Sequence, residues 1–227
     1  MPPLNRSKSF EEEYVNEYFL KQRVVGDPAP IGLFAFGTTQ LIYSLYLIQI
    51  ANVTNEQVGL GSALFYGGLI QVISGMFLLY SGKTLGATIF CSYGGFWISF
   101  GFVHLPSSGI IDSFKDDQLM FRNAIGIYLA VWAIFSFLMI IASLRTTVLE
   151  ILCLTCVFIV FIFLVIASFT GLTVCYRIGG CFGVIGTICA WYIGMAHLLT
   201  KDVSYFILPL FPINHPPIAD SESSRNV

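Results

Sequence analysis

Residues 148–168 read VLEILCLTCVFIVFIFLVIAS, and Glu150 is the only charged side chain among them. A transmembrane helix needs about 20 consecutive, mostly apolar residues, so this run is long enough to be one. Five further segments of similar length contain no Asp, Glu, Lys or Arg: Ile31–Ile50, Val58–Tyr80, Leu85–Val103, Asn123–Ala142 and Ile178–Leu199. The sequence therefore predicts an all-α membrane protein, a bundle of six transmembrane helices.

The composition of the whole chain agrees with this fold class. Hydrophobic residues make up 56% of the 227 residues and charged residues only 11%, whereas a soluble domain carries about 25% charged residues. The net charge of -2 gives no indication of nucleic-acid binding. The sequence contains no residues with the spacing of a metal site and no hydrolase or phosphate-binding motif. We therefore expect no enzymatic activity, no metal and no cofactor.

The basic residues predict the orientation of the bundle, because cytoplasmic loops carry an excess of Lys and Arg. Eight basic residues fall on the side that holds both chain ends and the two tight turns: Arg6, Lys8, Lys21, Arg23, Lys83, Arg145, Lys201 and Arg225. Three fall on the other side: Lys115, Arg122 and Arg177. We therefore expect a cytoplasmic polar segment at 1–26, a transmembrane domain at 27–200 and a cytoplasmic tail at 201–227.

Small residues recur at helical spacing inside the predicted spans. Gly59, Ala63 and Gly67 stand at every fourth residue of the second segment, and the sixth segment contains similar series. Small side chains let membrane helices approach one another closely. The stripes fit packing within one bundle, or alternatively the lining of a narrow pore or a contact between subunits.

Uncharged polar side chains are concentrated in the first three segments, among them Thr38, Thr39, Gln40 and Gln71. Polar groups buried at membrane depth need hydrogen-bond partners or water. These residues therefore indicate either hydrogen bonds between helices or a hydrated path through the bundle.

The first span opens with the sequence GDPAPIGL at residues 26–33. Pro30 suits the first turn of a helix, where its missing N–H costs nothing, and Asp27 stands near the expected cap. The stretch is either a plain helix start or a rigid entry at which the helix N-terminus faces a permeation route and attracts an anion. Asp27, Pro28 and Pro30 are the candidate residues for such an entry.

Glu150 is open to two interpretations. Thr147-Val-Leu-Glu150 matches the capping-box pattern at the start of the fifth helix. The alternative is a role for the Glu150 carboxylate in relaying protons.

The chain contains, in this order, the sequences DPAPIGL at 27–33, FYGGLIQ at 65–71 and SYGGFW at 92–97. Together they resemble the motifs of the acetate uptake transporter family, which includes the bacterial succinate–acetate permeases and the yeast acetate and ammonia-export transporters. Residues 27–33, DPAPIGL, resemble the family's Asn-Pro-Ala-Pro-Leu-Gly-Leu signature, with Asp27 in place of the Asn and Ile31 in place of the first Leu. FYGGLIQ at 65–71 and SYGGFW at 92–97 resemble its motifs in the second and third helices. Further matches lie in the fourth helix and after the sixth: Tyr128, Leu129, Trp132 and residues 204–209.

The resemblance implies a six-helix subunit with a pore through each subunit, assembled as a homohexamer in the lipid bilayer of the plasma membrane. It implies passage of acetate and related short carboxylates, such as succinate or lactate, either coupled to protons or channel-like.

Family members narrow at a Phe–Leu–Tyr constriction, and the resemblance carries these roles onto this chain. By motif position the Phe is similar to Phe36 and the Tyr to Tyr93. Counting from Val148 places the Leu near Cys156, with Leu154 two residues away; a cysteine at this point predicts a wider neck. Two further residues are expected beside the pore: Gln71 and Ala190.

Two other functions fit the same observations. One is a membrane regulatory protein that senses carboxylates by binding them without moving them. The other is passage of ammonium or another small solute, which only the naming of the yeast members suggests.

Overall fold

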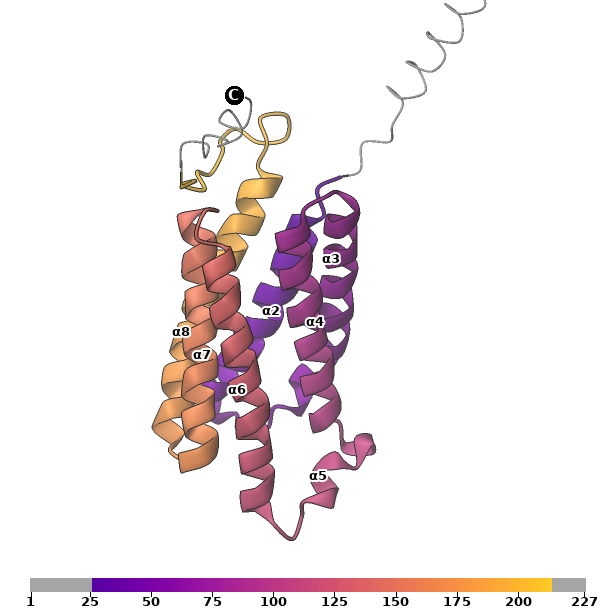
Figure 1. Ribbon diagram of the computed structural model, residues 1–227, viewed down its shortest axis with the longest axis vertical. Helices are drawn as coiled ribbons and strands as arrows, with labels where there is room; N and C mark the ends of the chain where they lie inside the picture. Colours follow the sequence, from indigo (N-terminus) through magenta and orange to yellow (C-terminus); the bar gives the residue numbers. More distant parts are fainter. Residues whose placement is uncertain (1–25, 214–227) are drawn as a thin grey trace, which may run out of the picture.

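The computed structural model describes residues 26–213, which form a bundle of long helices (Figure 1). Six helices are long and apolar enough to cross a membrane: α2 (Ala29–Ile48), a composite helix at Gln57–Tyr80, α4 (Thr84–His104), α6 (Gln118–Ala142), α7 (Val148–Thr170) and α8 (Thr173–Leu198). The composite helix joins η2 (Gln57–Gly59), the π-helical η3 (Ser62–Ile70) and α3 (Gln71–Tyr80). The prediction of a six-helix membrane bundle is confirmed. What was predicted for 1–25 and 214–227 lies outside the described residues.

Two helices begin earlier than the apolar segments predict. α6 begins at Gln118, and the Asp117 carboxylate caps it by accepting a hydrogen bond of 2.8 Å from the Met120 N–H. α8 begins at Thr173. Both early turns contain an arginine, Arg122 in α6 and Arg177 in α8, which excluded them from the predicted spans.

The two ends of the transmembrane domain lie on the same face of the bundle (Figure 1). This face, called the terminal face below, carries Asp27 before α2, the turns at 81–83 and 143–147, and the end of α8. The opposite face carries the connections at 49–56, 105–117 and 171–172, including the short helices η1 (Ile50–Asn52), η4 (Pro106–Ser108) and α5 (Ile110–Ser113).

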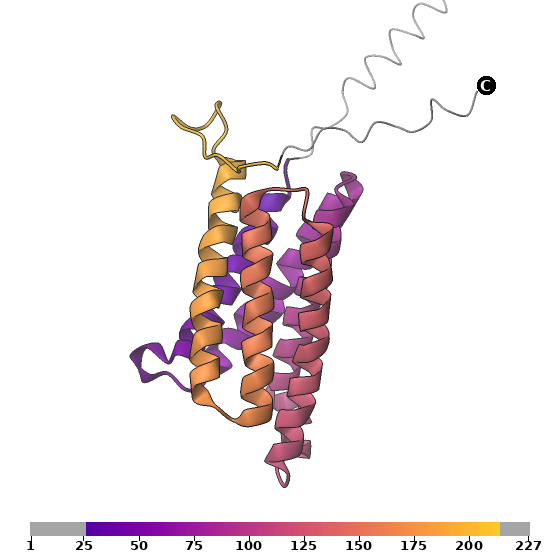
Figure 2. The same cartoon turned by 60° about the vertical axis from the view of Figure 1, so that its left-hand side comes forward.

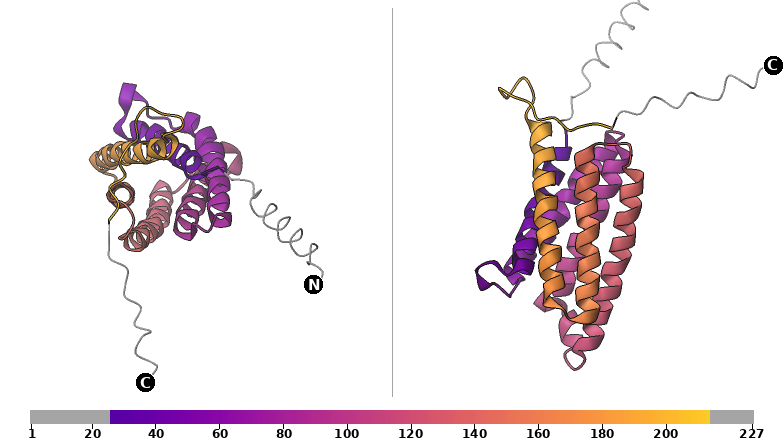
Figure 3. Two further views of the ribbon diagram at one scale, coloured as in Figure 1. Left: turned by 90° about the horizontal axis from the view of Figure 1, so that it is seen from above. Right: turned by 90° about the vertical axis from the view of Figure 1, so that its left-hand side faces the viewer.

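Each long helix packs along its neighbours in a defined order. α6, α7 and α8 lie side by side (Figure 2), α8 packs along α2, and α2 packs along the composite helix, which in turn packs against α4. Figure 3 shows the same arrangement from above and from the side. α4 and α6 meet mainly through large aromatic side chains, since Tyr93 pairs with Trp132 and Phe135. The helices therefore surround an interior filled by side chains of α2, α4, α6 and α7.

The small residues of the composite helix serve close packing against α2. A Cβ atom added to Gly67 would lie 2.6 Å from the Thr39 hydroxyl oxygen, and Thr39 is fully buried. Ala63 is also fully buried. At Gly67, therefore, the glycine is needed for the two helices to touch.

Residues beyond α8 fold back over the terminal face. The Val148 N–H donates to the Phe211 carbonyl at 3.1 Å, and the Ile213 N–H donates to the Thr146 carbonyl at 2.9 Å. The Tyr192 hydroxyl donates to the Pro209 carbonyl at 3.1 Å. This segment therefore ties α8 to the turn before α7.

Candidate functional site: two cavities along the bundle

The bundle contains a cavity of about 380 Å³ that opens near the terminal face. Residues of that face line it, among them Lys83, Thr146 and His197. Deeper in the bundle its walls are apolar and aromatic: Leu33, Phe36, Phe90, Tyr93, Leu154 and Val157. We call it the terminal-face cavity.

A second cavity of about 240 Å³ lies in the other half of the bundle. Its outer lining includes Glu56, His104 and Arg122, which belong to the opposite face. Its inner lining is again aromatic and apolar: Tyr43, Phe96, Trp97, Leu129, Val157 and Phe161. We call it the opposite-face cavity.

Three helices line both cavities with one continuous stripe each. On α7 the stripe runs through Glu150, Leu154, Val157, Phe161 and Leu164, which are spaced three or four residues apart and so share one helix face. α2 and α4 contribute similar stripes, from Leu33 to Leu47 and from Ile89 to His104. Val157 is the residue that the two linings have in common. The cavities therefore lie end to end and adjoin at Val157.

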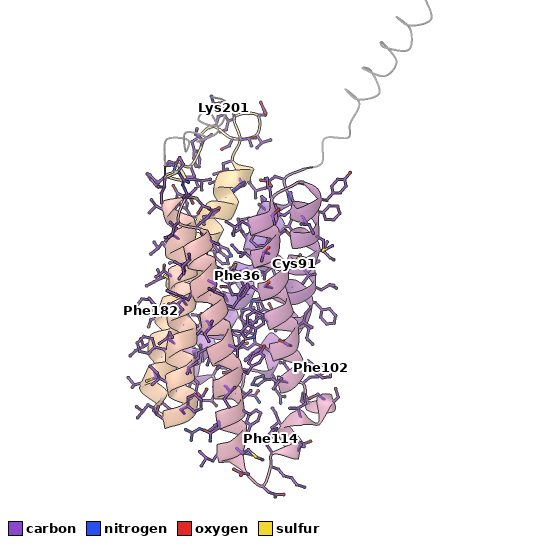
Figure 4. All side chains as sticks on the ribbon, in the orientation of Figure 1. Phe36, Cys91, Phe102, Phe114, Phe182 and Lys201 are labelled. Atoms are coloured by element: carbon purple, nitrogen blue, oxygen red, sulfur yellow. The ribbon has the colours of Figure 1, made fainter. Side chains whose placement is uncertain are left out.

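Phe36 and Tyr93, which the sequence assigns to one constriction, both line the terminal-face cavity. Their ring centroids lie 6.4 Å apart, and both side chains are buried. Figure 4 shows Phe36 in the interior of the bundle, while Phe102 and Phe182 point outward from it. The Tyr93 hydroxyl donates a hydrogen bond of 2.9 Å to Ser136 Oγ, which itself donates to the Trp132 carbonyl. Tyr93 thus joins α4 to α6 at this level.

The helix α7 residues proposed for the constriction occupy different positions. Leu154 lines the terminal-face cavity. Cys156 lines neither cavity and faces α8, where a Cβ on Gly186 would lie 3.3 Å from the Cys156 Cβ. Val157 was not singled out from the sequence, although the spacing of the α7 stripe points to it. Neither cavity is lined by Ala190, which is fully buried against α2 beside Gly37.

Gln71, which the sequence predicts to lie beside a pore, lines the terminal-face cavity. Its side chain is 1% exposed, and its Oε1 atom has no hydrogen-bond partner among residues 26–213. The Ser143 hydroxyl in the same lining is equally without a partner within this range. The lining of the cavity therefore contains two buried polar groups that no residue in this range satisfies.

The entry segment forms a polar cluster at the mouth of the terminal-face cavity. Asp27 Oδ2 lies 2.6 Å from His197 Nδ1, and Asp27 Oδ1 lies 3.2 Å from Lys83 Nζ and accepts a bond from the Ala29 N–H. Partial burial acts to raise the pKa of Asp27, but the hydrogen bonds from Ala29, His197 and Lys83 outweigh it and lower that pKa below its usual range. Asp27 is thus a carboxylate that binds the side chains of Lys83 and His197 at the cavity mouth.

The two prolines of the entry segment are structural neighbours of this cluster. The Pro28 carbonyl accepts a hydrogen bond of 2.6 Å from Ser74 Oγ, and Pro30 is buried in the first turn of α2. Neither proline lines a cavity. The Pro28 carbonyl holds the start of α2 against the composite helix.

Glu150 caps α7. The Glu150 N–H donates to Thr147 Oγ1 at 3.2 Å, and the Thr147 N–H donates to Glu150 Oε2 at 3.3 Å, which completes the capping box. The side chain also lines the terminal-face cavity. Capping is therefore the interaction that the described residues provide for this carboxylate.

Comparisons with known proteins agree with the resemblance seen in the motifs. The sequence model of the GPR1/FUN34/yaaH family matches residues 13–215. The chain is 37% identical over 187 residues to "Ammonia transport outward protein 2" of Saccharomyces cerevisiae, a match that covers 82% of the chain and 66% of the yeast protein. It is 34% identical over 209 residues to "Acetate permease A" of Emericella nidulans, covering 84% of the chain and 67% of that relative.

One solved structure has the same fold over most of the chain. The bacterial acetate channel SatP superposes with a TM-score of 0.73 at 26% sequence identity, covering 82% of this chain and 99% of that one. The long helices and their order are therefore shared with a known membrane channel, while this chain spans about two thirds of the length of the two fungal relatives.

Proposed function

Because the chain belongs to the GPR1/FUN34/yaaH family, we propose that it carries acetate and related short-chain carboxylates across a membrane. The observation that carries the proposal is the pair of cavities that adjoin at Val157 and extend toward the two faces of the bundle. Relatives named as an acetate permease and an acetate channel support the choice of substrate.

We propose that Phe36, Tyr93 and Val157 form a neck where the two cavities adjoin, and that this neck controls passage. Phe36 and Val157 supply apolar surface there, and Tyr93 supplies the one hydroxyl group of the trio. A carboxylate that enters such a neck loses its water, which is costly unless its charge is neutralised or hydrogen-bonded. Apolar constrictions of this kind also close by losing their own water.

The hydrogen bond of Tyr93 favours passage of the neutral acid. The Tyr93 hydroxyl already donates its proton to Ser136, so its oxygen is free only to accept. A protonated carboxylic acid can donate to that oxygen, whereas a carboxylate has no proton to donate. We therefore expect each carboxylate to cross the neck together with a proton, which makes the transport proton-linked.

The orientation, membrane and assembly form part of the same proposal. The excess of basic residues on the terminal face supports a cytoplasmic location for both ends, by the rule for membrane loops. The large apolar residues exposed on the outside of the bundle, such as Ile127 and Ile134, suit contact with lipid or with other subunits. We propose a homohexamer in the plasma membrane that accepts acetate first, with succinate and lactate as further substrates.

Uptake of labelled acetate into liposomes that hold the purified full-length protein tests the proposal. We expect uptake above that of protein-free liposomes, faster when the outside is more acidic than the inside. Tyr93→Ala is expected to reduce uptake, whereas Tyr80→Ala, which alters a residue 80% exposed on the outer surface, is not.

Two outcomes would replace the proposal. Binding of acetate without uptake would favour a carboxylate sensor. Uptake of ammonium but not of acetate would favour a permease for that cation. Uptake unchanged by Tyr93→Ala, at equal amounts of inserted protein, would contradict the proposed role of the neck.

A further inference from the structure

The opposite-face cavity contains a group of polar side chains that the neck does not use. Tyr43 is 5% exposed, and its hydroxyl has no hydrogen-bond partner among residues 26–213. A buried hydroxyl without a partner costs about 1–3 kcal/mol, so such groups normally meet water or a ligand. Tyr43 lines the cavity. Its hydroxyl is therefore an unsatisfied buried group in the lining of the cavity, and a molecule bound there could supply its partner.

Arg122 supplies positive charge to the same cavity. Its Nε atom donates a hydrogen bond of 3.1 Å to the Ser168 carbonyl, which holds the side chain between α6 and α7. Within the described range its two terminal nitrogens donate no hydrogen bond. A guanidinium group binds carboxylates through just such a pair of N–H donors. Arg122 can thus hold an anion in the cavity while α7 keeps it in position.

Glu56 places a carboxyl group in the lining of this anion-attracting cavity. It is half-buried at the opposite face, and no described residue forms an ion pair or a side-chain hydrogen bond with it. Burial raises the pKa of the Glu56 carboxyl above its ordinary value. An ionised Glu56 would repel a bound carboxylate, whereas a protonated Glu56 would not and could also donate a hydrogen bond to it.

We propose that the opposite-face cavity is a loading site in which Glu56 binds a proton while Arg122 and the Tyr43 hydroxyl bind a carboxylate. The inference rests on the proposed transport of short carboxylates and adds the place at which the carboxylate and its proton meet. A protonated Glu56 does not repel the carboxylate, and a bound carboxylate in turn favours the protonated form of Glu56. The affinity for the proton and the affinity for the carboxylate therefore rise by the same factor.

The other titratable groups that face this cavity are His104 at the end of α4 and Tyr176 on α8. His104 Nδ1 lies 2.9 Å from the Phe100 carbonyl, and its ring is tilted against the Phe100 ring with centroids 4.2 Å apart. An imidazole can also gain charge in mildly acidic solution. His104 is therefore the group from which Glu56 must be distinguished by experiment.

Binding of acetate to the purified full-length protein, measured calorimetrically at pH 7.5 and pH 5.5, tests the inference. Acetate itself stays mainly ionised over this range, because carboxylic acids have pKa values of about 4. Wild-type protein is expected to bind acetate on the order of tenfold more tightly at pH 5.5, the factor that corresponds to about 1.4 kcal/mol of removed repulsion.

Four variants complete the test. Glu56→Gln, which resembles the protonated form, is expected to bind acetate with the same affinity at both pH values. His104→Gln, and Asp116→Asn on the same face, are expected to keep the tightening. Tyr43→Phe, which removes only the hydroxyl, is expected to weaken binding at both pH values and leave their ratio unchanged.

A Glu56→Gln protein that still binds more tightly at pH 5.5 would overturn the inference, as would loss of the tightening in His104→Gln alone. A wild-type protein that neither binds nor moves acetate would instead overturn the transport proposal on which the inference rests.

Discussion

Val157→Phe tests the position of the neck most sharply. Val157 is 5% exposed and is the residue shared by the linings of the two cavities. A ring at this point adds bulk where Phe36 and Tyr93 already approach each other, and overpacking of a well-filled site costs about 1–3 kcal/mol. If a permeating acid meets that cost at the neck, flux falls by about 5-fold to 150-fold.

The assay for this variant is the initial rate of acetate uptake into liposomes, divided by the amount of folded, inserted protein. Cys156→Ala is the matched comparison, because Cys156 is the next residue along α7 but faces α8 and lines neither cavity. We expect Cys156→Ala to transport like wild type. Wild-type flux through Val157→Phe, together with altered flux through Cys156→Ala, would refute the assignment of Val157 to the neck.

Three further predictions concern the residues around the path. Gly67→Val is expected to lower stability in detergent by about 1–3 kcal/mol, because its Cβ would overlap Thr39. Gly61→Val is the control, because a Cβ at Gly61 has open space around it. Equal melting temperatures for the two variants would contradict the close contact between the helices. Asp27→Asn keeps an oxygen that can accept from the Ala29 N–H but removes the charge from the contacts with Lys83 and His197. An exposed ion pair is worth at most about 1 kcal/mol, so the melting temperature should fall about 2–4 °C below wild type near pH 6. Because the folded-state pKa of Asp27 is lowered, that stability is present above the ordinary carboxyl pKa and is lost as the pH falls through the lowered one, so the two melting curves should converge in acid. Glu150→Gln can still complete the capping box, so neither stability nor the pH dependence of acetate uptake should change; a flattened pH profile of uptake would show that Glu150 relays protons.

The six spans could be predicted because a helix that crosses lipid needs a long apolar segment, and charged residues are almost absent from these six segments. Their ends could not be placed by the same rule. α6 and α8 extend beyond the apolar runs, and the arginine at the fifth position of each helix, Arg122 or Arg177, made its start look like a loop. The cap that starts α6, the Asp117 carboxylate, is a local interaction that average hydropathy does not register.

Motifs that fix a helix face made it possible to predict that two side chains lie near each other. Phe36 and Tyr93 come from different helices, and the structure places their rings side by side. On α7, counting from Val148 leads to Cys156, which faces α8. Val157 is the next residue, and its side chain points about 100° away, toward the cavities. The spacing of Glu150, Leu154 and Val157 indicates that Val157, and not Cys156, shares the helix face that lines the cavities.

The opposite-face cavity could not be assembled from the sequence at all. Tyr43 lies in α2, Glu56 in the connection before the composite helix and Arg122 in α6. No local sequence pattern indicates that these three residues line one cavity. Glu56 lies in a connection, where a carboxylate is normally solvated. Only the packing of the helices brings these groups together.

The most direct measurement uses a reactive side chain at the neck itself. Val157→Cys would be made in a protein whose six native cysteines, none of them in a disulfide, are replaced by alanine. A small methanethiosulfonate reagent should then block acetate uptake, and excess acetate should slow the block. Phe102→Cys, placed on the outer surface in the same background, should not respond. Full acetate uptake after complete modification at position 157 would show that the substrate does not pass between Phe36, Tyr93 and Val157.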